Sequence, residues 1–281
     1  MMRPICRLAI AAALILLTWS AAAVRAAGTE LVLAVVPQFP ALDIHRTWTP
    51  IAKTVEIATG RTVRLKIYPS IPVFEQDFMA GVPDIVYLNP FHMVMAHRAR
   101  GYVPLVRDSA QQLSGILLVQ AGSSITNVAE LEGRQIAFPA PNAFGASLLL
   151  RALLTEQFHI GFSPNYVRTH SNAYRYVARG EMAAAGGIRS TFEREPEDLR
   201  SKLKVLYETP RFASHPVAVH PRLAADLRAT IARTFLQMRA TEAGRAELAA
   251  VALSEPVMAE YRRDYGVLEK LGLERHAVLE N

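Results

Sequence analysis

Cysteine is almost absent from this chain of 281 residues: the only one is Cys6, close to the amino terminus. The rest of the chain can therefore form no disulfide bond and no thiolate metal site, and it has no cysteine nucleophile. His92 and His97 are five positions apart, which does not put both on one helical face, and the other histidines are scattered. We therefore expect no bound metal and no cofactor.

The familiar catalytic motifs are missing as well. The sequence has no G-x-S-x-G elbow, no H-E-x-x-H pair, no Walker A loop and no G-x-G-x-x-G turn after a strand. Asp84 and Glu193 have no recognisable acid or base partner in the sequence. The chain is therefore predicted not to be an enzyme, and an enzymatic role is kept only as the weakest alternative.

Charge of one sign does not accumulate anywhere in the chain. The net charge of +6 arises from 31 Lys and Arg residues and 25 Asp and Glu residues that are mixed along the sequence. A nucleic-acid-binding protein would show a clustered basic stripe, so no nucleic-acid partner is expected. Beyond the amino-terminal region, charges interrupt every apolar run within about a dozen residues, too short to span a bilayer. Contact with a membrane is thus expected only through a partner protein.

The one long apolar run lies at the amino terminus, at residues 8–19, after Arg3 and Arg7 and before small residues that continue to Ala26. This order of basic, apolar and small residues is typical of a secretory signal peptide. We therefore expect residues 1–26 to be a signal peptide that is removed after Ala26, and the mature protein to be periplasmic.

Beyond this region, patterns typical of strands and helices alternate. Short apolar runs such as "ELVLAVVP" predict buried strands, and apolar residues at helical spacing, as in "DIHRTWTPIAKTVEIATG", predict helices. Strands are predicted within residues 30–37, 61–70, 83–90, 102–108, 114–122, 134–140, 165–170 and 183–188, and residues 203–221 are predicted to cross out of the lobe in a segment interrupted by prolines. This alternation indicates an α/β protein in which each sheet is mainly parallel and flanked by helices.

The length of the mature chain favours two lobes. Crossings are expected near residues 109–114 and 208–216, so the chain would leave the first lobe and later return to it. The predicted domains are lobe 1, residues 27–110 and 209–281, and lobe 2, residues 111–208. Such lobes can hinge around a ligand held between them.

The stretch "IAFPAPNAFGASLLLRALL", residues 136–154, interrupts an apolar run with two prolines, Asn142 and Gly145. Asparagine caps helices well and glycine permits close backbone approach, so the stretch is predicted to be a strand-to-helix turn. The first amide groups of a helix can bind an anion. The alternative is that the turn only caps its helix.

The segment "FEQDFMAGVPDIVYLNP" matches a pattern of a known protein family. Its matching residues are Phe74, Gly81, Asp84, Ile85, Tyr87 and Pro90. Further matches occur in "GILLVQAGSSITNVAELEGRQIAFPA" and "THSNAYRYVARGEMAAAGGIRSTFE". Over residues 31–219 the chain resembles the periplasmic solute-binding proteins of the phosphonate/phosphite/phosphate ABC-transport type.

The resemblance implies a two-lobed periplasmic binding protein fold with a hinge, and a ligand cleft between the lobes. Tyr87 falls on the family's cleft aromatic and His170 on its cleft histidine, so the two are expected to face each other across the cleft. Alternatively, Tyr87 is a core residue and His170 only caps a helix. The predicted ligand-binding residues are Tyr87, Asn89, Asn142, Ala143, Phe144, Gly145, His170 and Ser171.

Two departures from the family pattern concern the ligand. Where phosphonate binders usually carry a hydroxyl-rich "S-[ST]-S-G" cradle, this chain has residues 142–145, "NAFG", and Ala183 replaces a frequent acidic residue. Two hydroxyl donors are missing, so Phe144 is expected to retune the site and to weaken binding of small tetrahedral oxyanions. The predicted ligand is a small polar or anionic, phosphonate- or oxyanion-like solute.

The resemblance leaves the membrane partner open. An ABC permease is the expected partner, and delivery of the ligand to a transporter is the expected role. The alternative is a ligand-binding input protein for a sensor histidine kinase, because the same closed lobes can dock on the ectodomain of a kinase.

Overall fold

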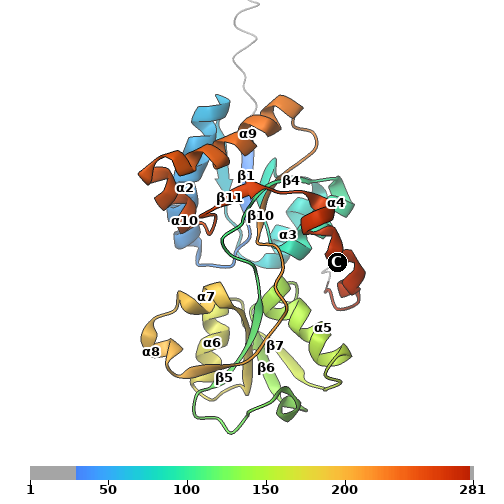
Figure 1. Cartoon of the computed structure of the whole chain (residues 1–281). Coiled ribbons are helices and arrows are strands. Elements are labelled where there is room, and N and C mark those ends of the chain that lie inside the picture. The colour runs from blue at the N-terminus through green and yellow to red at the C-terminus, as the bar shows by residue number, and fades with distance from the viewer. Residues whose placement is uncertain (1–29, 279–281) are drawn as a thin grey trace, which may run out of the picture.

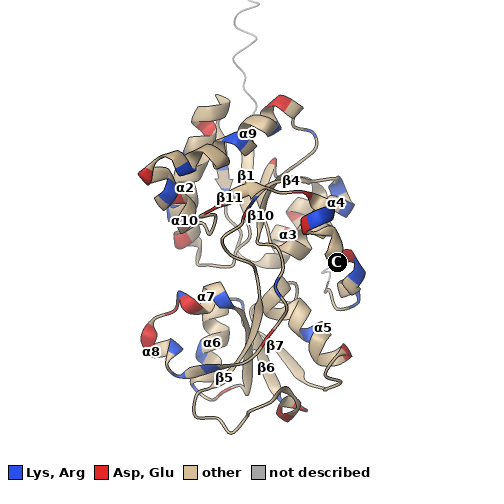
Figure 2. Ribbon diagram, viewed as in Figure 1, with Lys and Arg blue, Asp and Glu red and all other residues tan. Residues whose placement is uncertain are grey.

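The computed structural model describes residues 30–278, which form two lobes, one above the other, each built around its own sheet (Figure 1). The signal peptide expected at residues 1–26 lies outside the described residues. No helix within residues 30–278 is long and apolar enough to cross a membrane. Positively and negatively charged residues alternate along the ribbon of both lobes (Figure 2).

The sheet of the first lobe has six strands in the order β11-β4-β10-β3-β1-β2. They are β1 (Leu31–Val35), β2 (Val63–Lys66), β3 (Ile85–Tyr87), β4 (Val103–Asp108), β10 (Pro216–Val219) and β11 (Pro256–Met258). Strand β1 is parallel to β2 and β3, whereas β10 is antiparallel to β3 and β4, and β11 is antiparallel to β4. Strands β1, β2, β3 and β4 therefore run in one direction. Strands β10 and β11 run in the opposite direction and belong to the part of the chain that returns from the second lobe.

The helices of this lobe pack around the sheet. They are α2 (Ala41–Thr59), α3 (Ile71–Ala80), α4 (Pro90–Arg100), α9 (Ala225–Gln237), α10 (Glu242–Ala250) and α11 (Tyr261–Asp264), with short turns η4 (Met238–Ala240), η5 (Gly266–Leu271) and η6 (Leu273–Arg275).

Helix α2 shows how apolar residues at helical spacing form a buried face. This face consists of Ile44, Trp48, Ile51, Ala52 and Val55. Pro50 is tolerated within it because the carbonyl left without a donor belongs to Arg46, on the exposed side. The helix ends at Gly60, with φ 64°.

The sheet of the second lobe has five strands in the order β7-β6-β8-β5-β9. They are β5 (Gly115–Gln120), β6 (Gln135–Phe138), β7 (Ser163–Tyr166), β8 (Ala184–Ile188) and β9 (Leu203–Glu208). Its helices are α5 (Leu149–Glu156), α6 (His170–Ala178), α7 (Arg189–Glu193) and α8 (Glu197–Arg200), with turns η2 (Val128–Leu131) and η3 (Phe144–Leu148). Strand β5 is antiparallel to β8 and β9, and the other pairs are parallel.

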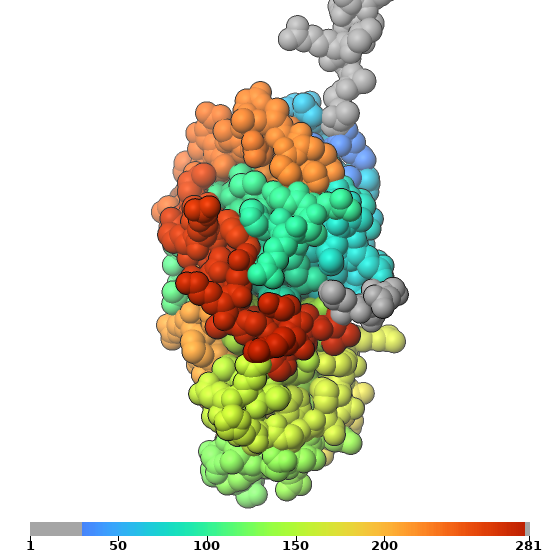
Figure 3. Space-filling view, turned by 90° about the vertical axis from the view of Figure 1, so that its right-hand side faces the viewer, coloured from blue at the N-terminus to red at the C-terminus, as the bar shows by residue number. Residues whose placement is uncertain are grey.

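Two chain segments connect the lobes, one between β4 and β5 and one between β9 and β10. They lie side by side and are joined by a bridge in which Leu113 and Phe212 exchange backbone hydrogen bonds of 2.9 Å each. The C-terminal segment, residues 272–278, runs from the first lobe onto the second (Figure 3). The carboxyl ends of β1 and β3 thus face the second lobe across the hinge.

Candidate functional site

A small cavity, here called the first cavity, lies between the lobes beside the hinge. Its lining residues are Val36, Gln38, Ile71, Asn89, Leu113, Ala143, Phe144, Gly145, Ala146, His170, Ile188 and His215. They come from strand ends, helix starts and crossings of both lobes. Ligand sites of α/β proteins form at the carboxyl ends of strands in this way.

From the first lobe, Asn89 lines the cavity as the N-cap of helix α4. It also contacts the second lobe. Its side-chain oxygen accepts a hydrogen bond from the His92 backbone N–H at 2.8 Å, the usual bond of an N-cap. Its side-chain amide donates to the backbone oxygen of Asn142 in the second lobe at 3.2 Å. Asn89 is therefore held in one orientation at the edge of the cavity.

From the second lobe, the turn after β6 contributes the start of a helix. The helix begins at Phe144, because η3 runs directly into α5. The N–H groups of Ser147 and Leu148 both donate to the carbonyl of Ala143. The N–H groups of residues 144–146 precede this first turn and have no acceptor within the helix. These three residues line the cavity, so hydrogen-bond donors and the positive end of the helix dipole meet there.

Gly145 is required by close packing at this turn. A Cβ atom at this position would lie 2.7 Å from Leu113 Cδ2 and 2.9 Å from Ile188 Cγ2. Such contacts are shorter than van der Waals distance, so a side chain at this position would push the turn away from the hinge.

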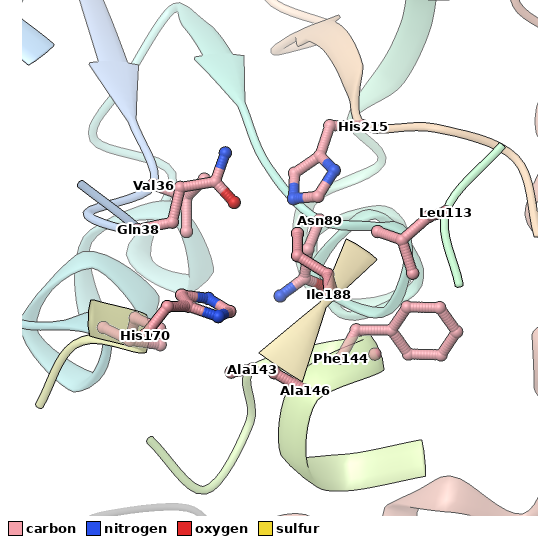
Figure 4. Close-up of a pocket in the computed structure, with 12 residues that line it drawn as sticks. Val36, Gln38, Asn89, Leu113, Ala143, Phe144, Ala146, His170, Ile188 and His215 are labelled. Carbon is pink, nitrogen blue, oxygen red and sulfur yellow. The ribbon is translucent and has the colours of Figure 1, made fainter. Parts of the chain in front are cut away.

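No Lys, Arg, Asp or Glu side chain lines the first cavity, and its titratable residues are two histidines. Burial lowers the pKa of His170 to about 4. Burial, with smaller contributions from His92 and His170, lowers the pKa of His215 to about 3. Both imidazoles are therefore neutral at neutral pH. Figure 4 shows the two rings pointing into the cavity from opposite lobes.

Tyr87 lies beside the first cavity and does not line it. Its buried ring lies between Trp48, 4.7 Å away between centroids, and His215, which stacks on it at 5.4 Å. Tyr87 lines a neighbouring second cavity and not the first one. In the first cavity the aromatic partner opposite His170 is therefore His215, and the contact of Tyr87 with a ligand stays a prediction.

The ring of Phe144 turns toward the hinge and Leu113 (Figure 4). It packs edge-on against Phe212, with centroids 5.4 Å apart. Phe144 nevertheless lines the first cavity, so its expected effect on the ligand space stays a prediction. The missing hydroxyl donors remain a reason to expect weak binding of tetrahedral oxyanions.

Two further predicted ligand residues direct their side chains elsewhere. The amide of Asn142 donates to Glu75 Oε2 at 3.1 Å and to the backbone oxygen of Val278 at 2.7 Å. The hydroxyl of Ser171 donates to the carboxylate of Glu195 within the second lobe. Neither residue lines the first cavity. Their expected contact with the ligand is therefore corrected to a structural role.

Sequence reasoning missed Gln38 and His215. Gln38 follows the first predicted strand and His215 lies in the second predicted crossing. A systematic inspection of polar residues just after strands and within crossings would have found both. No signal in the sequence indicated that His215, instead of Tyr87, would border the cavity.

The C-terminal segment forms a third contact between the lobes. The guanidinium of Arg151 in α5 donates to the backbone oxygen of His276 at 2.7 Å. Asn142 and Val278 exchange hydrogen bonds of 2.7 and 2.9 Å, and Glu156 accepts one of 2.7 Å from the His276 ring. These bonds fasten the end of lobe 1 onto the helix that borders the cavity.

Replacing Arg151 with methionine is expected to lower the melting temperature by roughly 5 °C and to speed amide exchange at Val278. The variant keeps the apolar stem but removes a charged donor from two backbone carbonyls, those of Pro141 and His276. A hydrogen bond to a charged group adds about 1.5–3 kcal/mol to the free energy of unfolding. In a chain of this size, each kcal/mol of lost stability lowers the melting temperature by about 2–4 °C. Differential scanning fluorimetry and hydrogen exchange measure both effects.

The matched control is Arg134→Met, because the side chain of Arg134 is exposed and has no bond within the described residues. An Arg151→Met protein with unchanged melting temperature and unchanged exchange at Val278 would contradict this role for Arg151.

Within residues 30–278, no group of three or more His, Cys, Asp or Glu side chains is placed to hold a metal ion. The arrangement in the first cavity is instead one of neutral hydrogen-bonding groups: two imidazoles, two side-chain amides and the first amides of a helix. Such a set can bind and orient a small polar or anionic solute.

The fold resembles solved binding proteins. A binding protein component of a phosphonate ABC transporter from Pseudomonas aeruginosa aligns with a TM-score of 0.77 at 15% identity, covering 88% of this chain and 87% of that one. PhnD1 from Prochlorococcus marinus, solved with methylphosphonate, aligns with a TM-score of 0.79 at 14% identity, covering 89% and 100%. These likenesses confirm the predicted two-lobed α/β periplasmic binding protein fold.

A comparison with curated proteins finds no match. A model of the family described as "ABC transporter, phosphonate, periplasmic substrate-binding protein" matches residues 33–265. This range is most of the chain and confirms the resemblance inferred from the sequence. The chain therefore belongs to the family of periplasmic substrate-binding proteins of phosphonate ABC transporters.

Proposed function

We propose that this protein captures a small phosphonate or a related oxyanion in the first cavity and presents it to an ABC permease. One observation carries the proposal: the first amides of the helix at residues 144–146 face two neutral imidazoles from opposite lobes in a single cavity. The phosphonate-bound relative from Prochlorococcus marinus supports the ligand class.

The binding groups are proposed to be the backbone of residues 144–146, the amide of Asn89 and the rings of His170 and His215. The helix dipole stabilises an anion at its amino end by about 0.3–2 kcal/mol, and a charged hydrogen bond adds about 1.5–3 kcal/mol. An oxyanion can therefore bind without a lysine or arginine, provided that several donors converge on it. The apolar side chains of Val36, Ile71 and Ile188 complete the cavity and suit a small alkyl substituent.

Closure of the lobes is proposed to follow the hinge at Leu113 and Phe212. The moving units would be residues 27–110 with 209–281, and residues 111–208. A hinge of this kind lets the ligand enter and then excludes water from it. The residues 1–26 are proposed to act as the signal peptide that exports the chain.

Isothermal titration calorimetry with methylphosphonate, phosphite and phosphate tests the ligand class. At least one of them is expected to bind and to raise the melting temperature, because a ligand at a hundredfold excess over Kd stabilises by about 2.7 kcal/mol. The His170→Gln variant is expected to lose roughly 10-fold or more in affinity, since it loses one hydrogen bond to a charged group. The exposed His45 provides the control His45→Gln.

Absence of binding for all three ligands would refute the proposal, and so would equal affinities for His170→Gln and the wild type. Turnover of any ligand would favour an enzyme instead. A pull-down with the detergent-solubilised permease tests the partner, and preferential binding to a sensor-kinase ectodomain would reverse that assignment.

A further inference from the structure

A second cavity adjoins the first one between the lobes. The two cavities share Gln38, Leu113, Ile188 and His215, so a ligand bound in the first can extend past His215 into the second. Unlike the first cavity, the second has charged residues in its lining: Asp108, Arg189 and Arg194.

Two of these charged groups are already engaged within the protein. The buried carboxylate of Asp108 accepts the backbone N–H groups of Glu255 at 2.7 Å and of Gln111 at 3.2 Å. The guanidinium of Arg189 binds both carboxylate oxygens of Glu208, at 3.2 and 3.1 Å from its Nε. The charge of Arg189 is therefore balanced by Glu208, whereas Asp108 is held by two backbone N–H groups and keeps its negative charge.

Arg194 is different, because it has no carboxylate partner among residues 30–278. Its guanidinium carbon lies 5.4 Å from the ring centroid of Phe39, a residue of the opposite lobe that also lines the second cavity. A cation held against a ring in this way spends none of its five N–H donors on hydrogen bonds. The exposed Arg194 therefore presents donors that no protein group uses, and a positive charge, at this cavity.

The neighbouring uncharged groups are free as well. The side chains of Ser190, Gln111 and Gln112 line the second cavity and form no hydrogen bond within the described part of the chain. The cavity thus offers a positive charge and hydrogen-bond donors, while its carboxylate is already engaged. The positive charge of Arg194 together with these donors suits a second anionic group.

We propose that the ligand is an oxyanion that carries a carboxylate, with the carboxylate bound by Arg194 in the second cavity. This inference rests on the proposed function, because the oxyanion head would occupy the first cavity. The planar guanidinium matches a carboxylate in a two-bond fork, which a lysine could not provide. Arg194 and Phe39 come from different lobes, so the carboxylate would also be held where the lobes meet.

Calorimetry with phosphonoacetate, methylphosphonate and 2-aminoethylphosphonate tests the inference. Phosphonoacetate is expected to bind roughly 10- to 100-fold more tightly than methylphosphonate, the usual effect of one charge-assisted pair. The Arg194→Gln variant is expected to lose this difference and to bind methylphosphonate as the wild type does. Arg228→Gln, in helix α9 and outside both cavities, makes the same change in net charge and is expected to behave as the wild type.

The outcomes separate the two proposals. Methylphosphonate binding without a preference for phosphonoacetate overturns the carboxylate subsite and leaves the proposed function standing. A preference for 2-aminoethylphosphonate, or an equal loss for both anions in Arg194→Gln, also overturns the subsite. If neither these ligands nor phosphite and phosphate bind, the proposed function fails and the subsite fails with it.

Discussion

Replacement of Gly115 by alanine is expected to lower the melting temperature by roughly 3–10 °C and to abolish ligand binding at the first cavity. A Cβ atom at Gly115 would lie 2.1 Å from the backbone oxygen of Gly145 and 3.1 Å from Thr209 Cγ2. Because the nearest atom belongs to a backbone, it cannot rotate away. Overpacking of this kind lowers the free energy of unfolding by about 1–3 kcal/mol or more. Each kcal/mol lowers the melting temperature by about 2–4 °C.

The effect on binding follows from what Gly145 does. It belongs to the turn whose amides line the first cavity, so a shift of its backbone oxygen moves the proposed anion donors. Calorimetry with methylphosphonate and scanning fluorimetry measure both effects.

Gly122→Ala is the matched control, because Gly122 follows the same strand, β5, and a Cβ there would meet nothing within 4 Å. The control is expected to keep the melting temperature and the affinity of the wild type. A Gly115→Ala protein that also keeps both would show that the approach of β5 to the turn is not needed.

Much of the fold could be predicted because its strands are buried as continuous apolar runs. The run at residues 30–37 contains β1, and the helical spacing of Ile44, Trp48 and Val55 marks the buried face of α2. The direction of β10 could not be predicted. A strand's own residues do not record whether its neighbours run parallel or antiparallel to it, which depends on how the chain returns through the hinge.

The sequence predicted those cavity residues whose place is decided by the position of the backbone. Asn89, Ala143, Phe144, Gly145 and His170 line the first cavity, since strand ends and helix starts place them there. The direction of a side chain depends on packing that the local sequence does not contain. Asn142 shows this clearly, because its amide is engaged by Glu75 and by Val278, which lies 136 residues further along the chain.

Acidification to about pH 5 without ligand is expected to lower the melting temperature by roughly 10 °C relative to about pH 7.5, mainly through His170 and His215. Burial lowers the pKa of His170 to about 4 and that of His215 to about 3, whereas an unfolded histidine titrates near 6.5. The unfolded chain therefore binds these two protons first as the pH falls. The stability that the neutral rings provide is complete above about pH 6.5 and is lost progressively toward pH 4, by up to about 2.7 kcal/mol per pH unit for two protons.

The variants His170→Gln and His215→Gln separate this effect from other acid-sensitive groups. Each is expected to remove about one proton from the pH dependence of the free energy of unfolding, measured by urea denaturation between about pH 7 and 5. His45→Gln, on the exposed side of α2, is the matched control. Carboxylates whose pKa is lowered, such as Asp264 beside Arg263 and Arg107, lose stability mostly below about pH 4, outside this window. His220, whose pKa is lowered by burial and by Arg222, titrates in every variant and cancels in the comparison.

One outcome would contradict this prediction: the free energy of unfolding depends on pH equally steeply in both cavity variants and in the wild type. The two imidazoles are then not held neutral in the folded protein, and the uncharged cavity that the proposed binding mode requires does not exist.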